Sequence, residues 1–258
     1  MDIVSYLLGK QSSGGGGSLD GVYKVNSIEE MEAISNPQTN DLCIIYDETE
    51  NKVGLYQYEN GEWEPIVRFP ILPNEYTEVT CINTSQGQYI NTNVLTNENT
   101  NVKYKMAIGT FKQYGPHLLS GQSTIFPMIR TLSNGQFYCQ ISSEVFYIGN
   151  FPRTPNKIYI FECNGTNIYL DNELKGTIAR TEFTDTKPLY IGTYGGDPNT
   201  TLYSSSLKIY YVKIFDGDTL IRKMIPCYRN SDKKVGMYDT INNVFYINDG
   251  AGNFSYDE

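Results

Sequence analysis

Few residues in this chain have the types and spacing that catalysis requires. The single histidine, His117, has no partner motif around it, and a general base without an orienting partner is a weak candidate. The stretch that starts at Gly121 lacks the second glycine of a nucleophile elbow, and no zinc-protease, phosphate-loop or dinucleotide motif occurs. A glycosidase needs two carboxylates across a cleft, whereas Asp171 and Glu173 fit a hairpin turn. We therefore expect no enzymatic activity.

Ligand binding by polar loops fits the sequence better than catalysis does. Tyrosine offers a flat ring for stacking on a sugar, and Asp and Asn can hydrogen-bond sugar hydroxyls. We predict a glycan site on rim loops, with these residues: Tyr194, Asp197 and Asn199 on one loop, and Tyr114 and His117 on another. The loop at 193–201 is also rich in oxygen ligands for Ca²⁺, but it holds a single Asp. No cofactor is expected, with calcium as the alternative.

The elements that would position such loops are short strands separated by turns. From residue 74 onward, β-branched and aromatic residues alternate with Asn-Gly and Asp-Gly turns, which predicts an antiparallel two-sheet sandwich. The expected strands are 102–111, 126–131, 136–141, 145–148, 157–163, 167–171 and 188–193. Asp216-Gly217 predicts a hairpin between strands at 207–215 and 220–225, and Pro226 is expected to end the second one.

Several spaced motifs carry a family resemblance. They are Leu220-Ile-Arg222, Ile225-Pro-Cys227, Met237-Tyr-Asp239, the glycine-rich Asp249 to Gly252, and an opening Tyr89-Ile-Asn-Thr. In this order they resemble the laminin-G-like, concanavalin-A-like jelly rolls found in virion proteins of phages that infect gut bacteria. The resemblance covers about residues 74 to 254 and implies a jelly-roll domain at 74–258. This sandwich hosts lectins, glycosidases and structural modules, so the fold alone does not fix the function.

The segment 19–73 predicts a small α+β module before the jelly roll. It begins with a strand at 22–25, and Ser27-Ile-Glu-Glu30 is a capping box that opens a helix to about Ser35. Strands follow at 42–46, 53–58 and 62–64, and a Pro-rich connector closes the module at 69–73. Because its core is small, we expect this β-α-β-β adapter to rest on the jelly roll or on a neighbouring subunit.

Residues 1–18 combine an apolar peptide with a Gly-rich tether. The apolar run is too short to cross a bilayer, and its flank is acidic, so neither membrane insertion nor a signal peptide is expected. The predicted anchor to a partner comprises Ile3, Val4, Tyr6, Leu7 and Leu8. The tether at 11–18 would span about 15 Å as a random coil. An engineered linker and a tail without a role remain the alternatives.

Charge and cysteine content exclude other classes of function. The net charge of −9 argues against nucleic-acid binding, which needs a continuous basic face. The five cysteines are scattered and odd in number, which predicts buried free thiols rather than a disulfide framework.

These features together predict a phage virion structural protein, a head or tail fibre or decoration protein. We expect its N-terminal peptide to bind capsid or tail proteins, and its jelly roll to bind host cell-surface carbohydrate. A homo-oligomer with many weak sites would gain avidity. Such a protein is assembled in the bacterial host cytoplasm and located in the virion. A structural spacer without a ligand is the alternative, and a glycan depolymerase is a third hypothesis.

Overall fold

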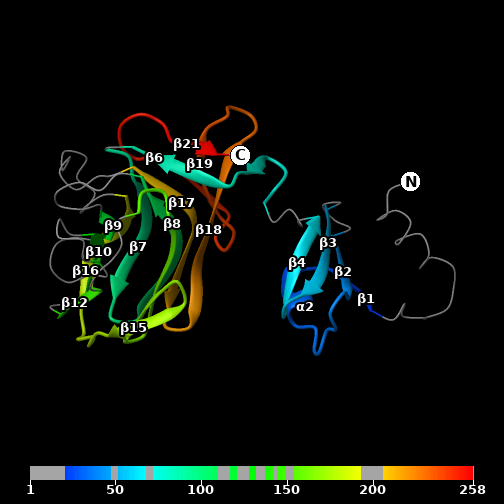
Figure 1. The fold of residues 1–258 in the computed structure, drawn as a ribbon. Helices are drawn as coiled ribbons and strands as arrows, with labels where there is room; N and C mark the ends of the chain where they lie inside the picture. Colours follow the sequence, from blue (N-terminus) through cyan, green and yellow to red (C-terminus); the bar gives the residue numbers. More distant parts are fainter. Residues whose placement is uncertain are drawn as a thin grey trace. The chain divides into compact units, whose positions relative to one another are not determined.

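The computed structural model describes residues 21–47, 52–67, 72–85, 87–109, 117–120, 128–131, 137–141, 144–148, 154–192 and 206–257. The chain divides into two compact units, residues 1–73 and 74–258 (Figure 1).

The first unit is a four-stranded sheet with one short helix. Its elements are β1 (Val22–Val25), α2 (Ile28–Glu32), β2 (Leu42–Asp47), β3 (Lys52–Glu59) and β4 (Glu62–Val67). The strand order is β1-β2-β3-β4, with β1 parallel to β2 and the other pairs antiparallel. The element order is β-α-β-β-β, and Ser27 Oγ accepts a hydrogen bond from Glu30 N at 3.2 Å, as the predicted capping box requires of its N-cap residue. The helix ends at Glu32, earlier than the sequence predicted.

The second unit contains two antiparallel sheets. The six-stranded sheet has the order β12-β11-β10-β9-β16-β7. Its strands are β7 (Ile90–Asn97), β9 (His117–Ser120), β10 (Met128–Thr131), β11 (Phe137–Ile141), β12 (Glu144–Ile148) and β16 (Thr184–Ile191). The eleven-stranded sheet has the main order β15-β14-β13-β8-β17-β18-β19-β20, with β5, β6 and β21 attached to it. Its strands are β5 (Tyr76–Glu78), β6 (Cys81–Thr84), β8 (Thr100–Ile108), β13 (Ile158–Asn164), β14 (Asn167–Leu170), β15 (Glu173–Thr177), β17 (Leu207–Asp216), β18 (Thr219–Arg229), β19 (Val235–Asp239), β20 (Val244–Ile247) and β21 (Ser255–Asp257).

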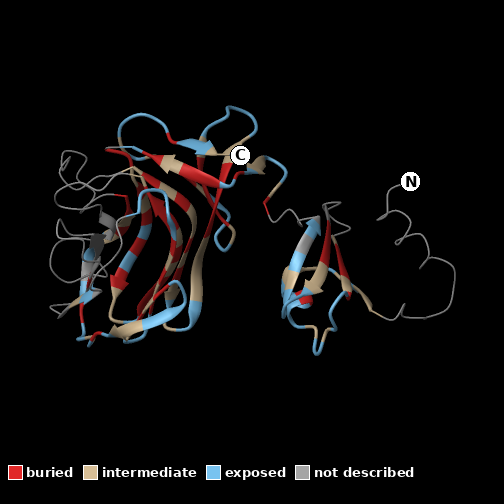
Figure 2. Ribbon diagram, in the orientation of Figure 1, coloured by how far each residue is buried: buried red, intermediate tan, exposed pale blue. Residues whose placement is uncertain are grey.

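The two sheets of this unit share one hydrophobic core. Ile90 and Leu189 from the six-stranded sheet join Val102, Phe161 and Ile214 from the other sheet in a single buried cluster. Buried residues alternate with more exposed ones along the strands, as period-two side-chain geometry requires (Figure 2). The predicted mostly β, antiparallel two-sheet sandwich is therefore confirmed.

Pro226 does not end its strand, contrary to the sequence prediction. It lies inside β18 and is paired with Met237 of β19. The Pro226 carbonyl accepts a hydrogen bond from Val79 N, on the side of β5. Because the N and C=O of one strand residue point to the same side, the missing N–H faces away from β19 and removes no bond from that pairing.

The opening motif of the unit is held by its glycine-rich tail. Asn248 Oδ1 accepts a hydrogen bond from Tyr89 N at 3.0 Å, and Asp249 Oδ2 accepts one from Asn91 N at 3.0 Å. Gly250 fits tightly here, since a Cβ on it would clash with the Gly87 carbonyl oxygen. The opening motif and the glycine-rich tail therefore have a structural role, because they connect the two ends of the domain.

Candidate functional site

Most of the predicted site residues lie outside the described part of the chain. This holds for the glycan candidates Tyr114, Tyr194, Asp197 and Asn199, for the calcium candidate loop at 193–201, and for the anchor residues Ile3, Val4, Tyr6, Leu7 and Leu8. Among the described residues, no group of three or more His, Cys, Asp or Glu side chains could hold a metal ion.

His117 was predicted on a rim loop, but it is the first residue of β9. Its backbone pairs with Arg130, and Leu119 two positions later pairs with Ile191 near the end of β16. His117 is in a strand because β9 pairs with β10, and the backbone hydrogen bonds of this pairing hold the stretch extended. Antiparallel register therefore brings His117 to the same end of the sheet as Gly192, from which the predicted loop at 193–201 continues.

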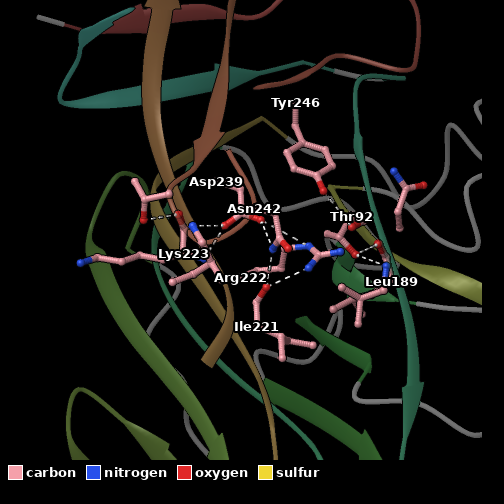
Figure 3. Close-up of polar contacts among 12 residues, drawn as sticks. Thr92, Leu189, Ile221, Arg222, Lys223, Asp239, Asn242 and Tyr246 are labelled. Carbon is pink, nitrogen blue, oxygen red and sulfur yellow. Dashed lines mark hydrogen bonds and ion pairs between the residues drawn. The ribbon is translucent and has the colours of Figure 1, made fainter. Parts of the chain in front are cut away.

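The interior of the sandwich contains a buried ion pair surrounded by hydrogen bonds (Figure 3). Arg222 Nε lies 3.4 Å from Asp239 Oδ2. Asp239 is fully buried and accepts hydrogen bonds from Lys223 N at 2.9 Å, Ile241 N at 3.1 Å and Asn242 Nδ2 at 2.8 Å. A carboxylate with three hydrogen bonds, an ion pair and no access to solvent is structural rather than catalytic.

A second buried contact, also in Figure 3, ties the sheets together. Thr92 Oγ1 donates to the Leu189 carbonyl at 2.7 Å, and Tyr246 Oη donates to the Thr92 carbonyl at 3.4 Å. Thr92 is fully buried, so these bonds satisfy polar groups that would otherwise cost stability. Neither buried contact can meet a ligand.

The cysteines are also unsuited to chemistry, and they are the buried free thiols that the sequence predicted. All five are free and buried. Burial raises the pKa of the Cys43 and Cys227 thiols to about 12. Burial also raises the pKa of Cys163, although the guanidinium of Arg180 opposes the shift. Because the thiolate is the nucleophilic form, these groups are inert at neutral pH.

A polar groove at one rim of the sandwich is the candidate site. It has a volume of about 330 Å³, at the lower end of the range for small-molecule sites, about 300 to 1,000 Å³. Its lining comprises Glu98, Asn99, Asn101, Asn164, Gly165, Thr166, Arg180, Gly217 and Asp218. A smaller hollow of about 90 Å³ shares Asn101, Asn164, Gly217 and Asp218 with it, and Phe215 is among its further lining residues. We call this the rim groove.

Three turns meet at the rim groove, two of them hairpin turns and one a link between the two sheets. They are the turns after β7, β13 and β17, and Asn164-Gly165 and Asp216-Gly217 supply two of them. Gly165 and Gly217 adopt positive φ angles of 54° and 57°, which glycine tolerates without a Cβ clash. The groove lies at the Asn97 end of β7. His117 and Gly192 lie at the opposite end, because β16 pairs Ile191 with Ile90 and Thr184 with Asn97.

Asn101 connects two of these turns, and Arg180 joins the third to them. Asn101 is 7% exposed; its Nδ2 donates to the Gly217 carbonyl at 2.8 Å, and its Oδ1 accepts from Gly165 N at 2.8 Å. Arg180 Nη2 donates to the same Oδ1 at 2.9 Å, while Nη1 donates to the carbonyls of Glu98 at 2.6 Å and Thr100 at 3.0 Å. Three loops from distant parts of the sequence are thereby held in a fixed arrangement, as a pre-organised site requires.

The chemistry of the rim groove suits a neutral polar ligand. Asn99, Asn164, Thr166 and Asp218 are exposed around it. Amide and carboxylate groups can pair with adjacent hydroxyls as donors and acceptors. The only cation in the lining is Arg180, whose two terminal nitrogens already donate within the protein. The groove therefore offers hydrogen bonds rather than a positive charge.

The first unit also has a hollow, of about 390 Å³, beside its helix. Apolar Met31, Ile34, Pro37 and Trp63 contribute to its lining. Met31 is buried in the core of this unit, and Trp63 packs against that core. This hollow has the character of a packing surface, so the rim groove remains the better ligand site.

Sequence reasoning identified two of the turns that form the rim groove but not the groove itself. Asn164-Gly165 and Asp216-Gly217 are visible as turn signals. The convergence of Asn101, Arg180 and Asp218 depends on long-range pairing, which a single sequence does not reveal. Nothing in the residues around Arg180 predicts that its side chain donates a hydrogen bond to the Thr100 carbonyl, 80 positions away.

Comparisons with known proteins support the fold. No protein-family model matches the sequence, and no curated protein matches it. A solved structure from Bacteroides ovatus, described as a "putative carbohydrate binding protein", matches with a TM-score of 0.50 and 9% sequence identity. The match covers 99% of this chain and 85% of that one. At this identity the likeness shows a shared fold. No helix among the described residues has the length and hydropathy to span a membrane.

Proposed function

We propose that this chain is a non-catalytic carbohydrate-binding protein and that its rim groove binds a glycan. The observation that carries the proposal is the pre-organised, hydroxyl-matching groove built by Asn101 and Arg180. The structural neighbour described as a carbohydrate-binding protein supports it. The absence of paired catalytic carboxylates in the sequence motifs points in the same direction.

Each part of the groove has a role in this proposal. The exposed side chains of Asn164 and Asp218 hydrogen-bond sugar hydroxyls, and Phe215 lines the smaller hollow beside them. An aromatic ring next to such polar groups packs against the apolar face of a sugar. Asn101 and Arg180 are positioning residues, since their donors and acceptors are engaged with the turns.

The test is binding of the intact chain to a microarray of bacterial surface glycans, followed by calorimetry with the best ligand. Asn164→Ala removes an exposed amide, Asp218→Asn replaces an acceptor oxygen with an amide donor, and each should weaken binding by about tenfold. Asn253→Ala is the matched control, because Asn253 is exposed and its backbone carbonyl accepts a hydrogen bond from Gln88, which lies just before the opposite end of β7. Equal affinity for all three variants and the unaltered chain would refute the groove.

The finer role that we propose is that of a phage virion fibre or decoration protein. Its support is the sequence resemblance, together with the apolar peptide and tether in residues 1–18. In this proposal the anchor binds capsid or tail proteins, and the glycan lies on the host surface. Cosedimentation of the intact chain with virions, lost on removal of residues 1–18, is the expected result. Equal sedimentation of both forms would contradict the anchor.

A structural spacer is the second candidate function. The observation in its favour is that the polar clusters in the interior serve stability, as Asp239 and Thr92 do. A spacer would bind no glycan on the array, whether or not the virion association is found.

A further inference from the structure

A row of lysines covers the outer face of the eleven-stranded sheet. Lys103 and Lys105 lie on β8, Lys208 and Lys213 on β17, and Lys223 on β18. The residues flanking the β8 and β17 lysines along the chain belong to the buried core, so these lysines point away from it. Lys223 is directly paired with Lys213, and its ammonium points away from the buried Asp239 cluster (Figure 3). We call these five residues the lysine face.

The register places three of these lysines side by side. Lys213 pairs with Lys103 on one side and with Lys223 on the other. Neighbouring strands are about 4.8 Å apart, and like charges placed directly opposite each other destabilise a sheet. A row of lysines that repel one another is unexpected in a chain of net charge −9. A negatively charged ligand that binds this row would explain it.

Carboxylates of the protein neutralise only part of the lysine face. Lys103 Nζ lies 2.8 Å from Glu162 Oε2, and Lys208 Nζ lies 2.5 Å from Asp257 Oδ2. Within the described ranges, Lys105 and Lys223 form no ion pair. The face therefore carries more positive than negative side chains.

Two tyrosines lie among these lysines because of a β-bulge. The register of β17 against β8 shifts between Ile209 and Tyr211. Lys105 Nζ lies 5.4 Å from the centroid of the Tyr210 ring, and Lys213 Nζ lies 5.9 Å from that of Tyr211. Both consecutive tyrosines thus accompany outward-facing lysines, whereas residues in a regular strand alternate between faces. The result combines flat aromatic surface with positive charge.

We propose that the lysine face binds an acidic polysaccharide that carries a carboxylate on each sugar, a polyuronate. A chain that crosses the strands can place some of its carboxylates beside Lys103, Lys213 and Lys223, which are neighbours across β8, β17 and β18. Tyr210 and Tyr211 supply ring surface for the sugars. This site is separate from the rim groove and does not depend on it.

The test uses the intact chain and two polymers with the same backbone. Polygalacturonate should bind at low ionic strength, and its fully methyl-esterified form should not, since esterification removes the charge. Binding should weaken as salt is added, because exposed charges are screened. The double variant Lys213→Gln with Lys223→Gln should lower affinity by about tenfold. The control Lys233→Gln with Lys234→Gln removes the same charge from an exposed turn and should bind like the unaltered chain.

Each other outcome would overturn the proposal. Equal binding of the esterified polymer would exclude recognition of carboxylates. Equal loss in the control variant would mean that overall charge, and not this face, is responsible. Binding of single-stranded DNA as tight as that of polygalacturonate would indicate a general polyanion or nucleic-acid surface. Asn164→Ala should leave polygalacturonate binding unchanged, which separates this site from the rim groove.

Discussion

Arg222 on β18 and Asp239 on β19 form an ion pair inside the sandwich, with Arg222 Nε 3.4 Å from Asp239 Oδ2. The two residues come from separate motifs of the sequence, Leu220-Ile-Arg222 and Met237-Tyr-Asp239. Asp239 also accepts hydrogen bonds from the backbone of Lys223 and Ile241. The motifs that carry the family resemblance thus connect neighbouring strands. Their presence in this order is evidence about the fold rather than about a ligand.

Removing the buried carboxylate should destabilise the protein strongly. Asp239→Ala would leave Arg222, whose side chain is 17% exposed, without its counter-charge and would orphan two backbone donors. The expected loss is about 3 to 5 kcal/mol in the free energy of unfolding, measured by urea denaturation. Asp232→Ala breaks an exposed pair with Arg229 and should change stability little. A similar effect of both variants would contradict a stabilising role for the buried pair.

The glycine-rich tail predicts a steric effect. In Gly250→Ala the new Cβ would clash with the Gly87 carbonyl oxygen, so the tail must move away from the opening strand. A loss of about 1 to 3 kcal/mol in unfolding free energy is expected. Ala251→Ser, at an exposed neighbour, is the control. Unchanged stability of Gly250→Ala in thermal denaturation would show that this contact is not close.

The cysteine thiols should be almost unreactive in the folded protein. Burial raises the pKa of Cys43 and Cys227 to about 12, so almost no thiolate is present near pH 8. A disulfide reagent such as dithiobisnitrobenzoate should react slowly with the native chain and with all five cysteines after unfolding. Rapid reaction of any thiol in the native state would contradict this burial.

The Lys208–Asp257 pair predicts a dependence of stability on acid. Hydrogen bonds from Lys208 and then Asn83 lower the pKa of Asp257. Because the folded-state pKa is depressed, the contribution is complete above the unfolded value of about 3.9 and is lost as the pH falls through the folded value. Asp257→Asn should therefore flatten the acid limb of a plot of Tm against pH.

The control for this acid effect is Asp218→Asn. Asp218 forms no ion pair within the described part of the chain. This variant should keep the slope of the unaltered protein, and a slope lowered equally in both variants would argue against the assignment to Asp257.

The fold was predictable because its signals are local. The turn at Asp216-Gly217 and the capping box at Ser27 depend on residues close in sequence, and both form. Pro226 was misjudged because its effect depends on which side of the strand its missing donor faces. That side is set by the partner strand and is not encoded locally.

The candidate site was less predictable for a related reason. Tyrosine-rich loops can be recognised in the sequence as possible ligand sites. The rim groove cannot, because it is shaped by a contact between Asn101 and Gly217, which are 116 positions apart. The lysine face is equally hidden, since Lys103 and Lys223 join one row only through the pairing of three strands. Register over such distances decides which polar residues share a surface.

The pairing of β21 with β6 has a consequence for protein synthesis. Asn83 donates to Asp257, 174 positions later, at 2.8 Å. During translation β6 has no β21 beside it until residues 255–257 have left the ribosome, and an unpaired strand edge can recruit other chains. Chains that stall before β21 has been made would therefore be released with an open edge on β6 that chaperones or proteases can recognise.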